Sequence, residues 1–132
     1  MADNNAYVSS TLRAVADSWP TQPRAVFAGF SQGVSMAFRA AAASPAPVSG
    51  LVAVGGDIPP EMGPSTLGRL RAVLMCRGSR DERYGARTFA ADAGRLQDSG
   101  VNVERCEFEG GHEWSRAVTE AAAGFLQKFS RA

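Results

Sequence analysis

The sequence predicts an α/β fold with a parallel sheet of about four strands and helices on both faces. Two observations support this fold class. Short apolar segments alternate with segments of helical periodicity, an order typical of repeated βαβ units. Turn residues bound each apolar segment, as expected for strands that are buried on both faces. At 132 residues the chain should form one domain, residues 1–132, with a sizeable core.

The predicted elements follow one another in a regular order. Residues 4–19 carry apolar side chains at helical spacing, and Pro20 ends that helix before Pro23 closes a short loop. Residues 25–30 are the first predicted strand, apolar on both faces. The later elements are a helix over 33–43, a strand over 51–54, an irregular connection over 57–68, a strand over 70–76, a helix over 84–98, an edge strand over 101–108 and a helix over 115–129.

Charge and composition exclude several function classes. The net charge of +1 is too small for electrostatic binding to nucleic acid or to an anionic membrane. We expect no membrane span and no secretory signal, because the sequence has no apolar run of sufficient length and no basic segment followed by an apolar stretch. Cys76 and Cys106 are too few for a zinc site or a disulfide framework and should be inert buried thiols. A cytoplasmic protein is the expectation.

The segment Gly29–Gly33 fits the pattern G-x-S-x-G, with an apolar strand before it and a helix after it. This context places Ser31 on a sharp turn from strand to helix, where its Oγ stands clear of the backbone. The flanking glycines should permit close packing around that corner. A serine at a helix N-terminus also lies beside free N–H groups that favour a developing oxyanion. The alternative is a glycine-rich turn with a capping serine.

A serine hydroxyl needs a base, and the sequence offers one histidine. His112 follows the fourth predicted strand in a Gly-Gly-His turn. In a parallel sheet this turn lies at the same carboxyl edge as Ser31. Asp81 follows the third strand at that edge and could orient the histidine. The order serine, aspartate, histidine along the chain is the order found in α/β-hydrolases.

Two other carboxylates compete with Asp81 for this role. Glu82 is adjacent to it, and Asp57 follows the second predicted strand at the same edge. Asp81 is favoured because the preceding Gly-Ser pair places it at the usual depth of such a turn.

Four segments resemble the phospholipase/carboxylesterase family of α/β-hydrolases. They span nearly the whole chain and are residues 29–37, 55–60, 77–81 and 109–112. The resemblance implies a truncated α/β-hydrolase with three layers, in which Ser31 is the nucleophile, His112 the base and Asp81 the acid. It also implies a serine esterase that cleaves short-chain or aryl carboxylic esters, sometimes lysophospholipids or thioesters, and that needs no cofactor or metal.

The sequence departs from that family in its length. Members are longer, and the half of the sheet that precedes residue 4 is missing here. That half carries the loop with the second N–H of the oxyanion hole, so only the backbone N–H of Gln32 can be carried over. One missing donor typically costs about 3–4 kcal/mol of transition-state stabilisation. The chain is therefore a slow enzyme, an enzyme that recruits a donor elsewhere, or a fragment.

The missing half also leaves the strand over 25–30 without a neighbour. An uncovered edge strand aggregates unless something pairs with it or covers it. We therefore expect a homo-oligomer, most simply a dimer. A non-catalytic association module is the competing hypothesis, in which the three residues remain by descent. Trp114 follows the histidine and either lines an acyl pocket or anchors the surface. The arginines over 69–83 are expected to form a solvated face.

Overall fold

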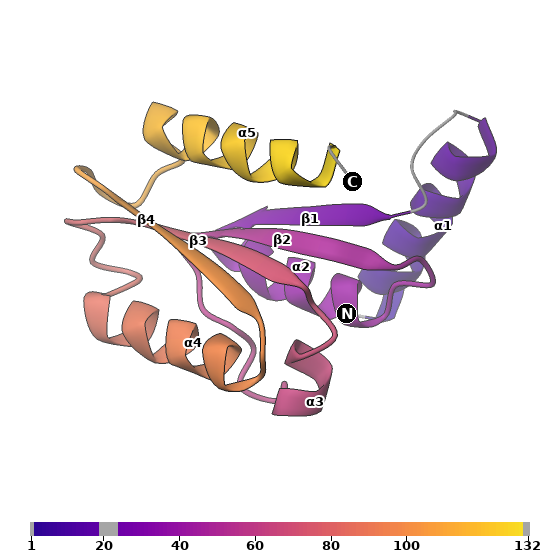
Figure 1. Ribbon diagram of the computed structural model, residues 1–132, viewed down its shortest axis with the longest axis horizontal. Coiled ribbons are helices and arrows are strands. Elements are labelled where there is room, and N and C mark those ends of the chain that lie inside the picture. The colour runs from indigo at the N-terminus through magenta and orange to yellow at the C-terminus, as the bar shows by residue number, and fades with distance from the viewer. Residues whose placement is uncertain (1, 19–23, 131–132) are drawn as a thin grey trace.

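The computed structural model describes residues 2–18 and 24–130 (Figure 1). Within these residues four parallel strands form one sheet, in the order β1-β2-β3-β4. Because all of them run the same way, their carboxyl ends share one edge of the sheet. The strands are β1 (Ala25–Phe30), β2 (Val48–Val54), β3 (Ala72–Gly78) and β4 (Asn102–Phe108).

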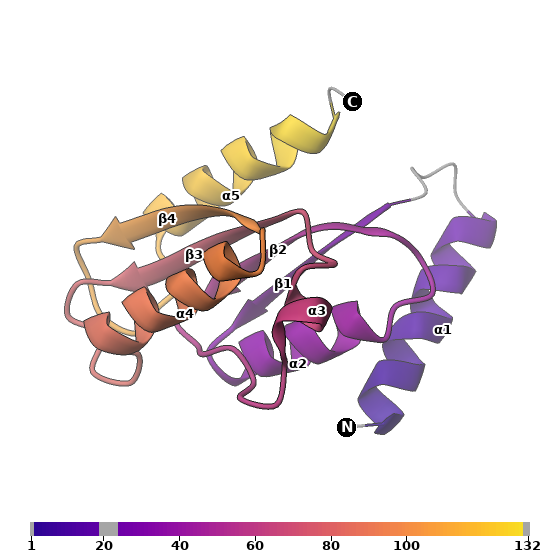
Figure 2. The same ribbon diagram turned by 60° about the horizontal axis from the view of Figure 1, so that its bottom comes forward.

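Helices cover both faces of this sheet, which gives the predicted three layers. Helix α5 lies over one face, and helices α2 and α4 lie over the other, as Figures 1 and 2 show from two directions. The helices are α1 (Ala2–Ser18), α2 (Gln32–Ala42), α3 (Pro64–Leu67), α4 (Ala86–Asp98) and α5 (Arg116–Ser130).

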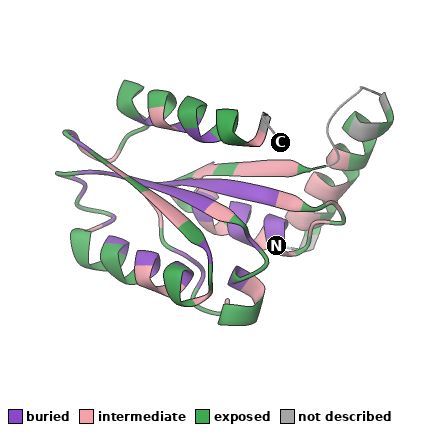
Figure 3. Cartoon of the chain, in the orientation of Figure 1, coloured by how far each residue is buried: buried purple, intermediate pink, exposed green. Residues whose placement is uncertain are grey.

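The core is split by the sheet into two apolar layers. Along β2, Leu51 and Ala53 face the cluster beneath α2 and α4, whereas Val52 and Val54 face the cluster beneath α5. This alternation with a period of two follows from strand geometry. Strands β2 and β3 are buried along almost their whole length (Figure 3), as expected for the centre of a parallel sheet.

Strand β1 is less covered than its composition predicts. None of its residues is fully buried, although an apolar strand of this kind is typical of the buried centre of a parallel sheet. Two features of the fold explain the difference. Helix α5 packs mainly over β2, β3 and β4, and α1 packs against α2. Strand β1 is therefore an edge strand whose two faces are only partly covered, with Val26 against the layer beneath α5 and Phe27 against the layer beneath α2 and α4.

Other differences concern short elements and boundaries. The connection over 57–68 contains the short helix α3, where the sequence indicated only irregular structure. The helix predicted over 84–98 begins at Ala86, so that Tyr84 belongs to the preceding loop. The predicted ends at Trp19 and Pro20, and the loop at Pro23, lie outside the described residues.

Candidate active site

Ser31 stands on a strained corner between β1 and α2. Its backbone has φ 58° and ψ −121°, and it is the one non-glycine with positive φ among the described residues. Such a conformation costs on the order of 1–3 kcal/mol and persists only where the surroundings impose it. The backbone N–H of Ser31 donates to the carbonyl of Val54 at 2.8 Å, and its carbonyl accepts from Val34 N–H at 3.1 Å. Strand β2 thus holds the corner in place.

The two glycines that flank Ser31 differ in their importance. A Cβ at Gly29 would lie 2.3 Å from the carbonyl oxygen of Gly33, which no real side chain tolerates. A Cβ at Gly33 would meet nothing within 4 Å. The expectation that both glycines permit close packing is therefore wrong for Gly33. A side chain is excluded at residue 29 because the backbone carbonyl of Gly33 lies too close to it.

His112 lies between Ser31 and Asp81. Its Nε2 is 2.8 Å from Ser31 Oγ, and its Nδ1 is 2.9 Å from Asp81 Oδ2. The ring of Phe30 packs beside the imidazole, with 5.0 Å between the ring centroids. On another side Gly55 has φ 65°, and a Cβ there would lie 3.3 Å from His112 Cε1. A side chain at residue 55 would therefore lie in tight contact with the imidazole, and the positive φ favours glycine there.

Asp81 is the carboxylate that contacts the histidine. Its side chain is 1% exposed, and its Oδ1 accepts hydrogen bonds from the N–H groups of Arg83 and Tyr84, both at 2.9 Å. Burial raises the pKa of Asp81, but the hydrogen bonds from His112 and from these two N–H groups outweigh that effect, so its pKa lies below the ordinary value. Asp81 is therefore an anion near neutral pH.

Glu82 and Asp57, the rival carboxylates, are both exposed. Asp57 lines the cavity in front of Ser31. Among the contacts of the described residues, the imidazole of His112 bonds to Asp81 and to neither rival. The geometry therefore joins Ser31, His112 and Asp81 in one chain of hydrogen bonds.

A buried network that sequence reasoning missed holds the loop with Asp81. Arg77 is buried, donates from Nε to the carbonyl of Tyr84 at 3.0 Å and pairs with Glu107. The Tyr84 hydroxyl donates to Asp92 on α4 at 2.7 Å. Burial raises the pKa of both Tyr84 and Asp92. No pattern along the chain points to this network, because its members meet only in the folded structure.

The Asp92 carboxylate also connects a second loop to this network. Asp92 accepts a hydrogen bond from the backbone N–H of Ile58 at 3.3 Å. Ile58 belongs to the loop after β2, and Tyr84 belongs to the loop after β3. One side chain on α4 therefore connects two of the loops at the edge of the sheet where Ser31 lies.

A cavity of about 320 Å³ lies in front of Ser31 and His112. Its lining is mostly polar and includes Gln32, the first residue of α2, whose backbone N–H has no partner within the helix. Trp114 is not among the lining residues; its indole N–H donates to Thr119 Oγ1 at 2.9 Å. Lining residues that the sequence did not single out are Ser35, Tyr84 and Thr88; Arg83, which was expected only on a solvated face, also lines the cavity.

The described residues contain no other evident reactive centre. They include no group of three or more His, Cys, Asp or Glu side chains placed to hold a metal ion. Cys76 and Cys106 face each other across β3 and β4 as free thiols, and burial raises the pKa of Cys76. No helix within the described ranges is long and apolar enough to cross a membrane.

A family model for phospholipases and carboxylesterases matches residues 1–130, nearly the whole chain. The chain belongs to the phospholipase/carboxylesterase family. This membership agrees with the resemblance of the four sequence segments. No curated protein sequence matches the chain.

Solved structures of the α/β-hydrolase fold superpose well on this family member. SOBER1 from Arabidopsis thaliana aligns with a TM-score of 0.74 at 20% identity, covering 94% of this chain and 61% of that one. Esterase PE8 aligns with a TM-score of 0.69 at 25% identity, covering 94% of this chain and 61% of that one. Acyl-protein thioesterase 2 from Zea mays aligns with a TM-score of 0.69 at 19% identity, covering 95% of this chain and 64% of that one. The chain thus spans about three fifths of these structures.

Proposed function

We propose that the protein is a serine carboxylesterase that hydrolyses short-chain or aryl carboxylic esters through an acyl-enzyme intermediate. The observation that carries this proposal is the continuous chain of hydrogen bonds from Ser31 through His112 to Asp81. Its members come from three separate loops at one edge of the sheet. Membership of the phospholipase/carboxylesterase family supports the same activity.

In the first half of the reaction, Ser31 Oγ attacks the ester carbonyl carbon. His112 Nε2 takes the hydroxyl proton, and the Asp81 carboxylate holds the imidazole in the correct tautomer and stabilises its cationic form. Collapse of the tetrahedral intermediate breaks the ester C–O bond. The alcohol leaves with the proton from His112, and the acyl group remains on Ser31.

In the second half, water attacks the acyl-enzyme. His112 takes a proton from that water and returns it to Ser31 Oγ as the acid departs. In both halves the backbone N–H of Gln32 stabilises the negative oxygen.

The cavity supports small ester substrates. It measures about 320 Å³, near the lower limit of common ligand sites, and its lining is largely polar. Long acyl chains need extended apolar surface, which this lining does not offer. We therefore propose acetyl, propionyl, butyryl and aryl esters as the preferred substrates.

A panel of p-nitrophenyl esters of increasing acyl length tests this proposal. We expect kcat/KM to be highest for the short acyl groups. A preference for chains of twelve or more carbons would contradict the proposed substrate class. Absence of hydrolysis across the whole panel would favour the association module over the enzyme.

Alanine variants test the assigned residues with the same substrates. We expect Ser31→Ala and His112→Ala to lower kcat by similar factors, on the order of 10⁴ to 10⁶, because the nucleophile and base act as a unit. Ser65→Ala, an exposed serine on α3, is the matched control and should keep the wild-type rate. If Ser31→Ala kept most of the activity, Ser31 could not be the nucleophile.

We also propose that the active form is a cytoplasmic homodimer. The exposed edge of β1 supports self-association, because a two-fold axis lets the same uncovered surface cover itself. Cys76 and Cys106 lie opposite each other on neighbouring strands and form no disulfide bond, which suits a reducing compartment.

A further inference from the structure

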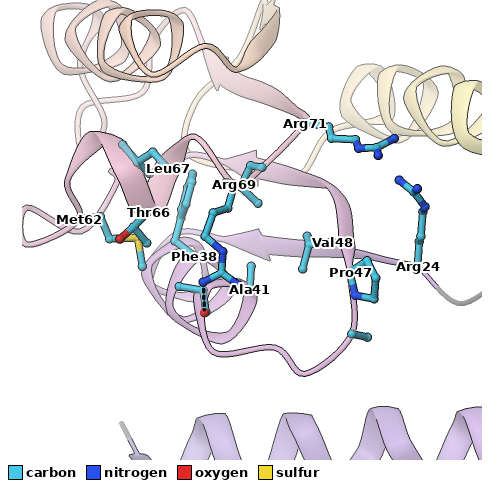
Figure 4. A pocket seen from close by; sticks show the side chains of 13 residues that line it. Arg24, Phe38, Ala41, Pro47, Val48, Met62, Thr66, Leu67, Arg69 and Arg71 are labelled. Carbon is cyan, nitrogen blue, oxygen red and sulfur yellow. Dashed lines mark hydrogen bonds between the residues drawn. The ribbon is translucent and has the colours of Figure 1, made fainter.

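A second cavity lies at the opposite end of the sheet from Ser31 (Figure 4). It measures about 200 Å³ and is formed where β1, β2 and β3 begin, beside the C-terminal end of α2 and the short helix α3. Strand β1 alone spans about 20 Å between this end and Ser31. A ligand in this cavity would therefore not touch the candidate active site.

The inner wall of the cavity is apolar and rigid. Phe38 from α2 is 1% exposed, Leu67 from α3 is 2% exposed and Leu70 is 7% exposed. These side chains belong to the main core cluster, so their positions are set by packing. Val48 and Met62, both partly buried against that cluster, extend the apolar wall. This part of the cavity suits a small hydrocarbon group.

The mouth of the cavity carries positive charge. Its lining includes Arg24, Arg69 and Arg71 but no Asp or Glu. Figure 4 shows the side chains of Arg24 and Arg71 extending toward each other, while Arg69 donates to the carbonyl of Ala42 at 3.4 Å. Within the part of the chain that the structure describes, none of the three arginines forms an ion pair.

Converging guanidinium groups without a counter-charge repel one another, and an anion between them removes that repulsion. Guanidinium groups also bind planar and tetrahedral oxyanions through paired N–H donors. A ligand that combines an oxyanion with a short apolar chain therefore matches both halves of the cavity. A neutral ligand would leave the arginines unpaired, and a bare inorganic anion would leave the apolar wall unfilled.

We propose that this cavity binds a small amphipathic anion, whose apolar chain lies against Phe38 and Leu67 and whose charged group lies between Arg24 and Arg71. The limited volume restricts the chain to a medium length. The shared chemistry of the ligand is an oxyanion on an aliphatic chain, either a carboxylate or a phosphate monoester. The site does not rest on the proposed ester hydrolysis, because Ser31 and His112 take no part in it.

Titration of the ¹⁵N-labelled full chain with octanoate, followed by NMR, locates the binding site directly. We expect saturable shifts of the amide signals of the non-proline residues in 42–48 and of residues 67–71, with one ligand per chain. Shifts confined to Gly55, Gln32 and His112 would place octanoate at the candidate active site and overturn the proposal. Octyl phosphate forms the second arm, and the tighter of the two ligands identifies the charged group.

Two ligands that lack one half of the amphiphile test its chemistry. We expect 1-octanol, which has the chain without the charge, and sulfate, which has the charge without the chain, each to bind at least ten-fold more weakly than octanoate. If octanol bound as tightly as octanoate, the arginines would not contribute to binding of the carboxylate, and the proposal would be overturned. Octanoate binding should also weaken as salt concentration rises, because the arginines are exposed.

Variants of residues outside the buried core separate the site from general charge effects. We expect the double variant Arg24→Gln, Arg71→Gln to raise the Kd for octanoate at least ten-fold. The control, Arg87→Gln with Arg116→Gln, removes the same charge elsewhere and should change the Kd less than two-fold. Thr66→Phe fills the cavity without changing charge and should also abolish binding. The amide spectrum of each variant reports its fold, and an unchanged Kd in the first variant would overturn the proposal.

Discussion

Asp81 combines burial with a low pKa, and this combination makes the native protein sensitive to acid. Its carboxylate receives hydrogen bonds from His112 and from two backbone N–H groups. Those bonds lower its pKa in spite of the burial that raises it. In the unfolded chain the carboxyl returns to its ordinary pKa of about 3.9. Its stabilising contribution is therefore complete above that pH and is lost as the pH falls through the lower native value.

Urea denaturation at a series of pH values measures this contribution. We expect the free energy of unfolding of the wild type to fall more steeply, between about pH 5 and about pH 2, than that of Asp81→Asn. The reason is that the asparagine amide does not titrate, whereas all other carboxyls are common to the two proteins. Equal slopes in the two proteins would show that Asp81 is not stabilised as an anion.

The residues of the candidate site were predictable from sequence because their positions follow from topology. Strands that run parallel bring their following loops to one edge, so Ser31, Asp81 and His112 were expected at the same edge, although the sequence did not exclude Glu82 and Asp57. The support beneath them was not predictable. Tyr84 and Asp92 look like ordinary helix residues in the sequence. The hydrogen bond between their side chains forms only in the folded structure.

Among the elements, helix α4 connects two of the loops around Ser31. Asp92 accepts from the Tyr84 hydroxyl and from Ile58 N–H, so it fixes the loop that carries Asp81 and the loop that follows β2. Removal of its side chain would leave two buried donors without an acceptor. Each such orphaned donor costs about 1–3 kcal/mol.

Two substitutions separate the hydrogen bonds of Asp92 from its charge. We expect Asp92→Ala to lower the free energy of unfolding by about 2–4 kcal/mol. Asp92→Asn keeps an acceptor oxygen and removes a charge whose burial is unfavourable, as the raised pKa of Asp92 indicates, so it should stay within about 1 kcal/mol of wild type at pH 7. Denaturation at pH 7 measures both. Equal losses in the two variants would mean that the charge, and not the hydrogen bonds, holds the loops.

The elements themselves were predictable to within a few residues, because buried strands and amphipathic helices have strong patterns. The short helix α3 was not, since its four residues are too few to show a helical period. Strand β1 lies at the edge of the sheet, as expected for a strand without a further neighbour. Its apolar composition alone would suit a central strand, because composition does not show which segments pair with it.

At the scale of the whole molecule, the open edge of β1 is the feature that most needs a partner. Ala28 is exposed on this strand, and Phe30 at its end is 37% exposed. Apolar surface left in water forgoes about 25 cal/mol per Å², so a few hundred Å² amount to several kcal/mol. That loss is comparable with the total stability of a domain. A second copy that covers β1 would recover it.

Light scattering across a dilution series tests the dimer. We expect the wild type to be a dimer at micromolar concentration and to lose activity as it dissociates. Ala28→Lys places a charge on the open strand and should shift the equilibrium to monomer, whereas Ala123→Lys, on an exposed position of α5, should not. A wild-type monomer that stays folded and fully active at nanomolar concentration would refute the proposed dimer.

The central claim is that Ser31 is a nucleophile activated by His112, and covalent labelling tests it most directly. A fluorophosphonate reacts with an activated serine and adds a mass that peptide mass spectrometry can locate. We predict one adduct, on the peptide that contains Ser31, in the wild type, and none on that peptide in Ser31→Ala or His112→Ala. An unlabelled wild type, or equal labelling of wild type and His112→Ala, would contradict the account.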